Sequence, residues 1–261
     1  MPKIREAAVS GMFYPDDPST LQTMVNSFLD NATILPHHFR AIIAPHAGYI
    51  YSGETAAKAY KQLSALKEKI NQVVLLGPAH RVAFSGLAAS SVDYFETPLG
   101  TIPLNKNAIR DLQQLPQVNI LDEAHAQEHS LEVHLPFLQT VLGDFSLIPL
   151  VVGDTDKESV SEVLEYFWHD PSVFFVISSD LSHFQEYNAA KTIDQQTANA
   201  IMNIKPEEIG YDQACGRMPI NGLLSLAQKY HLKPTLIDLS NSGDTAGSHD
   251  RVVGYGAFGF E

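Results

Sequence analysis

The chain has 261 residues, enough for one large α/β domain or two small ones, and 44% of them are hydrophobic. With 17 Lys and Arg against 30 Asp and Glu, the formal net charge is −13, which disfavours nonspecific contact with nucleic acid or an anionic membrane. No stretch approaches the roughly 18 apolar residues of a membrane span, and the first residues lack the apolar core of a signal peptide. A single cysteine allows no intrachain disulfide, so the composition predicts a cytoplasmic protein.

Short apolar strands and amphipathic helices alternate along the chain. Asp17 and Pro18 open the first predicted helix, whose apolar residues recur at helical spacing. This alternation predicts a three-layer α/β/α sandwich with a mainly parallel central sheet, in a single domain over residues 1–261. A turn predicted at Thr97-Pro98-Leu99-Gly100 adds a local antiparallel pair. The predicted strands are 40–44, 72–76, 85–90, 145–152, 173–178, 235–238 and 252–260, and the further predicted helices are 54–66, 156–167, 188–202 and 220–230.

Histidines and aspartates follow several of these strands, at the point where each strand ends. His46 and His80 follow the first two strands, Asp180 and His183 follow a later one, and Asp244 follows the next. Because ligands of open α/β sheets bind beyond the carboxyl ends of the strands, we expect these side chains to share one cleft. Two imidazoles and a carboxylate on one face of an ion form the ligand set of non-haem ferrous oxygenases. The pattern therefore predicts a metal-capable pocket.

Seven segments stand out along the chain: APHAGYIYSG, LLGPAH, TPLGTIPL, EHSLEVHLPFLQ, SSDLSHF, CGRMPI, and NSGD with VVGYGAFGF. In this order they resemble the successive motifs of the MEMO family, the protein B of AmmeMemoRadiSam systems. Any one tetrapeptide would be weak evidence, but the ordered set spans nearly the whole chain. The resemblance implies a fold related to class III extradiol dioxygenases, with a non-haem metal site at the matching place.

The resemblance also implies particular metal ligands. His46 and His80 match the two histidine ligands of the family. Eukaryotic members have a cysteine near the last strand, whereas counting back from Tyr255 places Asp244 or Thr245 there. We expect Asp244 to be the third ligand, because its carboxylate restores the two-histidine, one-carboxylate set of the dioxygenases. The expected ion is a divalent metal, with iron first and copper or zinc as alternatives.

Catalytic roles follow from the same resemblance. His183 matches the acid/base histidine of the dioxygenases, and Asp180 would orient it. These residues predict a redox or oxygen-dependent enzyme acting on a small or aromatic substrate. One alternative is a non-catalytic module that binds a phosphopeptide or protein at the same pocket, although Arg81 and Arg217 are the only basic residues beside the motifs. Another is an accessory protein that works with a radical SAM partner in a modification pathway.

The segment His125-Ala126-Gln127-Glu128-His129 fits the H-x-x-E-H pattern of inverted zinc peptidases. That mechanism requires both histidines on one helical face. Ser130 is predicted to cap a helix that begins at Leu131, so the motif would straddle a loop. We therefore disfavour the peptidase interpretation.

Four further residues are candidates for lining the pocket: Tyr49, His129, His134 and Cys215. His129 and His134 could equally cap a helix by hydrogen bonding to its backbone. Cys215 precedes a probable helix start, where a thiol can become reactive, but a lone cysteine is more often a small buried apolar residue. Tyr49 could equally be an ordinary packing aromatic.

Overall fold

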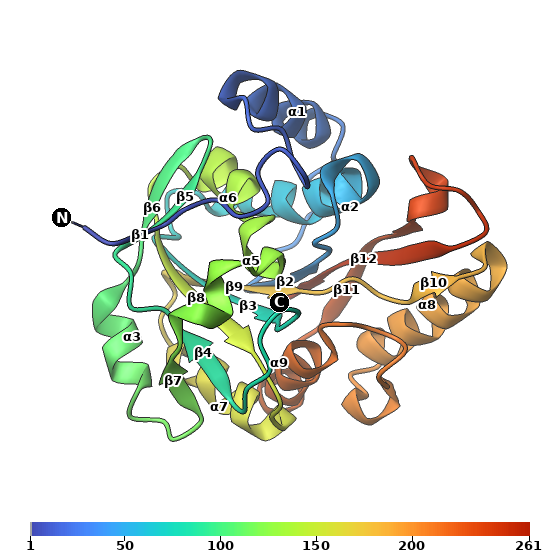
Figure 1. Ribbon diagram of the computed structural model, residues 1–261. Coiled ribbons are helices and arrows are strands. Elements are labelled where there is room, and N and C mark those ends of the chain that lie inside the picture. The colour runs from blue at the N-terminus through green and yellow to red at the C-terminus, as the bar shows by residue number, and fades with distance from the viewer. Residues whose placement is uncertain (1) are drawn as a thin grey trace.

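The computed structural model describes residues 2–261, and its centre is a nine-stranded sheet (Figure 1). The strand order is β10-β12-β2-β9-β3-β8-β4-β7, and β11 pairs with the other side of β12. The strands of this sheet are β2 (Ala41–Ala44), β3 (Gln72–Pro78), β4 (Leu87–Ala89), β7 (Val118–Ile120), β8 (Ser146–Val152), β9 (Val173–Ser178), β10 (His183–Gln185), β11 (Pro234–Asn241) and β12 (Val252–Phe260).

The central strands β2, β9, β3 and β8 run parallel to one another. They are apolar runs buried at nearly every position, as expected of strands covered on both faces. Antiparallel pairing occurs toward the edges, where β12 joins β2 and β4 joins β8. The prediction of a mainly parallel central sheet is therefore confirmed, and the carboxyl ends of its parallel strands open on one edge.

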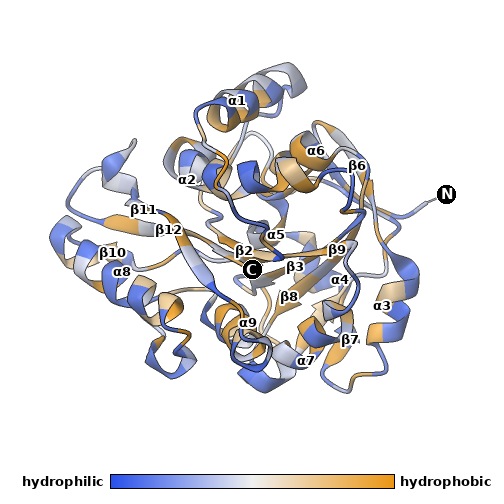
Figure 2. Ribbon diagram, turned by 180° about the vertical axis from the view of Figure 1, so that it is seen from behind, coloured by the Kyte–Doolittle hydropathy of each residue, from blue (hydrophilic) through white to orange (hydrophobic). Residues whose placement is uncertain are grey.

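Helices cover both faces of the sheet and complete three layers (Figures 1 and 2). On one face α2 packs against β2, and α1 and α6 pack against α2; on the other α9 packs against β3 and β9 and against α7. Figure 2 shows apolar residues concentrated on the central strands. The helices are α1 (Pro18–Asp30), α2 (Tyr49–Lys61), α3 (Lys106–Leu112), α4 (Asp122–Ala126), α5 (His129–Glu132), α6 (Leu135–Leu142), α7 (Lys157–Trp168), α8 (Tyr187–Met202) and α9 (Arg217–Tyr230), with short 3-10 turns η1 (Gln62–Leu66), η2 (Pro206–Glu208) and η3 (Ser242–Asp244).

A separate three-stranded sheet contains β1 (Ile4–Arg5), β5 (Tyr94–Thr97) and β6 (Gly100–Pro103). The strands β5 and β6 form an antiparallel hairpin in which Thr97 pairs with Gly100. Gly100 has a φ of +117°, a backbone conformation that glycine adopts without strain. The predicted turn and its antiparallel pair are thus confirmed.

A buried carboxylate ties the N-terminal segment to α5. Glu132 accepts hydrogen bonds from the backbone N–H of Ala8 at 2.8 Å and of Val9 at 3.0 Å. It also pairs with the Arg5 guanidinium and accepts from the Tyr14 hydroxyl. Because a buried charge must be paired and hydrogen-bonded, these contacts fix residues 5–14 against the part of the chain that carries the site.

Some helix boundaries differ from those predicted. The helix α2 begins at Tyr49 rather than Glu54, although aromatic residues and Gly53 are weak helix formers. A Cβ at Gly53 would lie 2.5 Å from the Phe28 ring, so the glycine permits close packing of α1 against this part of α2. The helix α5 begins at His129 and is capped by Glu128, not by Ser130 as predicted, because the Glu128 carboxylate accepts from the Ser130 N–H. Within residues 2–261 no helix combines the length and apolarity needed to cross a bilayer.

Candidate metal centre

Two histidines and the only cysteine of the chain meet at the carboxyl edge of the parallel strands. His46 follows β2, His80 follows β3, and Cys215 lies just before α9. One potential ligand atom from each lies within 4.8 Å of the other two. The imidazole centroids of His46 and His80 are 5.2 Å apart, and the Cys215 Sγ is 3.4 Å from the Nε2 of His46. The prediction that strand-end histidines converge is confirmed for this pair.

Hydrogen bonds fix the tautomer of His46. Its Nδ1 lies 2.6 Å from the Ser178 Oγ, which itself donates to the Ser130 carbonyl oxygen at 2.6 Å. Since a carbonyl oxygen can only accept, the hydroxyl proton is used there, and Ser178 must accept the Nδ1–H of His46. The Nε2 of the neutral imidazole is then unprotonated and faces the thiol. This is the atom that a metal ion would bind.

A carboxylate orients His80 in a comparable way. The Nδ1–H of His80 donates to the Glu128 Oε1 at 2.8 Å, and the His80 backbone N–H donates to Oε2 at 2.6 Å. Burial alone would raise the pKa of Glu128, but the hydrogen bonds and the charge of His80 outweigh it and lower that pKa to about 2. A carboxylate that holds a histidine in this manner is typical of metal sites, where it sets the ring orientation and increases ligand basicity.

Burial keeps the inner groups of the site uncharged. It lowers the pKa of His46 well below its usual value, and the neighbouring histidines His80 and His129 add to the effect. Burial, together with the nearby Asp180, raises the pKa of the Cys215 thiol to about 12. The protonated thiol can therefore donate to the Nε2 of His46, whereas a bound cation would favour the thiolate.

Two more histidines, both predicted candidates for the pocket, lie beside this pair. The His129 ring stacks on His80 with centroids 4.6 Å apart and is 5.3 Å from His46. His80, Glu128 and His129 form a second group of potential ligand atoms within 4.8 Å of one another. His134 is buried with its ring 6.5 Å from His46, and its Nδ1 lies 2.7 Å from the Tyr60 hydroxyl. Burial lowers its pKa to about 3.

Asp180 and His183 lie at the end of β9, as the sequence predicts, but they make different contacts. The Oδ1 of Asp180 accepts from the backbone N–H of His46 at 2.8 Å, so this carboxylate holds the loop after β2. Burial raises the pKa of Asp180 to about 6. The Nδ1–H of His183 donates to the Leu181 carbonyl oxygen at 2.8 Å, and that bond, rather than a contact with Asp180, orients the ring.

Asp244, the expected third ligand, lies in a different environment. Its Oδ1 accepts from the Tyr187 hydroxyl at 2.5 Å, and its Oδ2 accepts from the Asn241 N–H at 2.9 Å in a capping box around η3. Across residues 2–261 it belongs to neither group of potential ligands. Its neighbour Thr245 donates to the Tyr51 carbonyl oxygen at 3.0 Å. The structure thus brings Cys215, not Asp244, to the histidine pair.

Cys215 reaches the site because the loop before α9 approaches the end of β9 closely. The Gly216 N–H donates to the Ser179 Oγ at 2.9 Å, and a Cβ at Gly216 would lie 2.4 Å from the Ser178 carbonyl oxygen. Only glycine permits that approach. Cys215 was predicted as a candidate for lining the pocket, but not as a metal ligand. No sequence pattern predicted that this loop would bring the thiol beside strand ends far away along the chain.

The remaining sequence candidates are structural. The Tyr49 hydroxyl donates to the Val133 carbonyl oxygen at 2.7 Å, and its ring packs 4.9 Å from that of Phe137. The H-x-x-E-H segment is divided between α4 and α5, so its histidines do not share one helical face. His125 instead donates from Nε2 to the Ala88 carbonyl oxygen at 2.9 Å.

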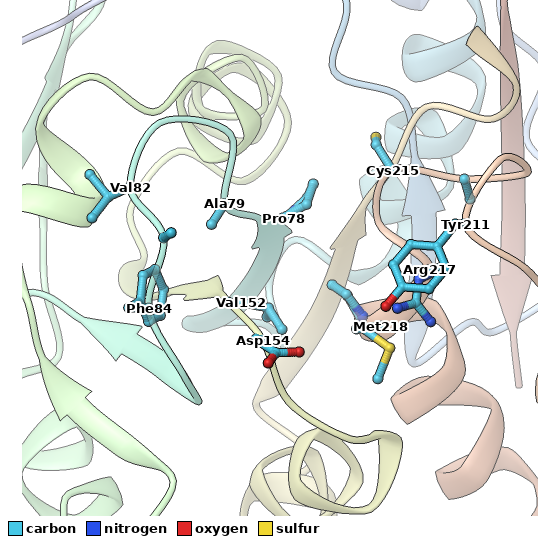
Figure 3. Close-up of a pocket in the computed structure, with 14 residues that line it drawn as sticks. Pro78, Ala79, Val82, Phe84, Val152, Asp154, Tyr211, Cys215, Arg217 and Met218 are labelled. Atoms are coloured by element: carbon cyan, nitrogen blue, oxygen red, sulfur yellow. The ribbon is translucent and has the colours of Figure 1, made fainter.

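A cavity of about 420 Å³ adjoins the histidine–cysteine group, and Cys215 forms part of its wall (Figure 3). Pro78 and Ala79, which precede His80, form another part of the wall. A ligand ion at the three residues would therefore lie beside a space of the size that holds small molecules.

Comparison with known proteins agrees with the motif pattern. The family model described as Memo-like protein matches residues 5–258. A MEMO1 family protein of Aquifex aeolicus is 34% identical over 97% of this chain and 97% of its own length. The Protein memo-1 homolog of Caenorhabditis elegans is 30% identical over 87% of this chain and 72% of its own.

Among solved structures, that of the uncharacterized protein JW3007 from Escherichia coli K12 is similar in fold. It has a TM-score of 0.56 at 11% identity and covers 84% of this chain and 99% of that one. The family model and the full-length relatives, together with the ordered motifs, show that the chain belongs to the MEMO family.

Proposed function

We propose that this protein binds one transition-metal ion through the Nε2 atoms of His46 and His80 and the Sγ of Cys215, for a redox or oxygen-dependent reaction on a small molecule in the adjoining cavity. The observation that carries the proposal is the convergence of three ligand atoms within 4.8 Å. Both imidazoles have their Nδ1–H engaged, by Ser178 and Glu128 respectively, which leaves the Nε2 atoms available.

The donor set suits a borderline or soft metal. Imidazole nitrogen binds iron, copper and zinc, and a thiolate in place of the expected carboxylate shifts preference toward softer ions. Three protein ligands leave at least one coordination position for substrate or water, as in catalytic rather than structural sites. A bound ion would supply Lewis acidity or electron transfer.

The chain's own residues would handle protons and binding. Because its Nδ1–H is donated to Leu181, His183 would present Nε2 as the atom that exchanges a proton with the substrate. Asp180 fixes the His46 loop through the backbone N–H. The cavity beside Cys215 admits the reacting molecule. The resemblance to extradiol dioxygenases supports a more specific proposal, in which the reaction is oxygen-dependent oxidation of an aromatic substrate.

Metal content tests the proposal. Protein purified anaerobically without added metal is analysed for its elements, together with His46→Ala, Cys215→Ser and the control His38→Ala. His38 is exposed, and among residues 2–261 its one hydrogen bond runs from the backbone N–H to Glu261. We expect about one ion per chain in wild type and control and little in the two site variants. Equal metal content in all four proteins would refute the ligand assignment.

Oxygen uptake tests whether the reaction is the oxidation of an aromatic substrate. Iron-reconstituted protein is screened with catechols and other small aromatic compounds, and oxygen consumption is recorded. Consumption that depends on His183 supports the dioxygenase-type reaction. Turnover that survives His183→Gln undiminished would contradict it.

A further inference from the structure

The cavity beside Cys215 has apolar walls and two separated charges (Figure 3). Figure 3 shows Phe84 on one side and Arg217 with Tyr211 on the opposite side, with Asp154 between them. Apolar residues make up most of the remaining wall, among them Ala79, Val82, Val152, Met218 and Pro219. A pocket of about 420 Å³ lies in the range of roughly 300–1,000 Å³ that is usual for small-molecule sites.

Arg217 stacks on the exposed ring of Tyr211 and leaves its side-chain hydrogen-bond donors unused within residues 2–261. Its guanidinium carbon lies 3.4 Å from the centroid of the Tyr211 ring, a cation–π contact. Its side chain has no hydrogen bond or ion pair with any of residues 2–261, and it is only partly exposed. A planar cation stacked in this way keeps available a fork of N–H groups that matches a carboxylate.

Asp154 places a negative charge in the same wall. Its backbone is tied to the segment that carries Phe84, because the Asp154 N–H donates to the Phe84 carbonyl oxygen at 2.8 Å. Within the described chain its carboxylate has neither a hydrogen-bond donor nor a cation as partner. The protein as a whole carries a formal charge of −13, so the surroundings do not favour a highly charged anion.

We propose that this cavity binds a small molecule with an apolar body and a single carboxylate, which Arg217 receives while Asp154 disfavours a second negative charge. That this molecule is the substrate rests on the proposed function, because Cys215 is both a proposed metal ligand and part of the cavity wall. Binding of the carboxylate itself requires no metal. The same charges disfavour a phosphomonoester, which carries up to two negative charges at neutral pH.

Calorimetric titration of metal-free protein at pH 8 tests this inference with three probes that share a phenyl ring and differ in their polar group. These are phenylacetate, phenyl phosphate and benzyl alcohol. We expect phenylacetate to bind most tightly. Arg217→Gln should weaken phenylacetate binding about ten-fold, since the lost contact is a charge-assisted pair. The affinity of Arg217→Lys for phenylacetate should lie between those of wild type and Arg217→Gln, because lysine keeps the positive charge but lacks the planar fork of N–H donors.

Asp154→Asn should change the affinity for phenyl phosphate rather than the affinity for phenylacetate. It should leave phenylacetate binding within about two-fold and raise the affinity for phenyl phosphate about two- to five-fold, as removal of an exposed like charge permits. Arg110→Gln is the matched control, since Arg110 is an exposed arginine on α3, away from the cavity. Circular dichroism checks that each variant is folded.

Two outcomes would overturn the inference: no preference for phenylacetate over benzyl alcohol, or an Arg217→Gln variant that binds phenylacetate as wild type does. A repeat with His46→Ala separates this inference from the metal proposal. If His46→Ala still binds phenylacetate more tightly than the other two probes, the carboxylate site is supported even though metal binding is lost. If wild-type protein holds no metal yet prefers phenylacetate, the proposed metal function fails, whereas the proposal of a carboxylate ligand is supported.

Discussion

His46 donates its Nδ1–H to the Ser178 Oγ at 2.6 Å, and the opposite ring nitrogen lies 3.4 Å from the Cys215 Sγ. One hydroxyl at the end of β9 therefore determines which nitrogen of a histidine after β2 is available to a ligand. Ser178 can do so only because its own proton is donated to Ser130.

Ser178→Ala should lower metal affinity while preserving the fold. Without the hydroxyl, the His46 ring loses the acceptor that fixes its tautomer and orientation, and partners of this kind typically contribute about 10–100-fold to metal affinity. Competition titration with a chromophoric chelator measures the effect. Ser27→Ala, at an exposed position of α1, serves as control. Affinity unchanged from wild type in Ser178→Ala would contradict the tautomer argument.

Glu128→Gln should make stability less dependent on pH in the acid range. The folded-state pKa of Glu128 is about 2, below its usual 4.5. Its ionised form therefore stabilises the fold above about pH 4.5, and this contribution is lost as the pH falls through the folded-state pKa. The full effect is on the order of 3 kcal/mol. Urea unfolding between pH 6 and pH 3 should show that the variant loses less unfolding free energy than wild type as the pH falls. Equal losses in the two proteins would count against a lowered pKa of Glu128 in the folded state.

Cys215→Ser and Asp244→Asn separate the two candidates for the third ligand. Cys215→Ser should lose most bound metal. Asp244→Asn should keep metal and lose about 1 kcal/mol of unfolding free energy, since it weakens the bonds to Tyr187 and Asn241. Elemental analysis and urea unfolding give the two readouts. The reverse pattern, with metal lost only in Asp244→Asn, would make Asp244 the ligand.

His183→Gln should retain metal and reduce turnover. The variant keeps a polar side chain but cannot exchange a proton near neutral pH, and a positioned acid/base group contributes typically about 10²–10⁴-fold. Metal content and oxygen-dependent turnover are measured on the same preparation. Loss of metal in this variant would indicate that His183 acts as a ligand or as a support for one.

The sequence predicted the parts of the site that depend on strand ends. His46 and His80 follow buried apolar runs, and parallel pairing of β2, β9 and β3 brings their carboxyl ends to one edge. Cys215 could not be found in this way, because it lies before α9, and a loop contact through Gly216 brings it there.

Helix starts near the site were harder to predict for a related reason. Ser130 has the side chain of a common helix cap, yet the buried Glu128 caps α5 while also orienting His80. The helix α2 begins at Tyr49, and its weak helix former Gly53 is packed closely against the Phe28 ring of α1. Local propensity predicts neither, because both depend on residues distant in sequence.

X-ray absorption at the edge of the bound metal, on protein purified anaerobically, identifies the atoms that hold the ion. We expect one sulfur ligand at about 2.3 Å and two nitrogen ligands near 2.0–2.1 Å, and we expect the sulfur to be lost in Cys215→Ser. A spectrum with only nitrogen and oxygen ligands in the wild-type protein would contradict this assignment of ligands.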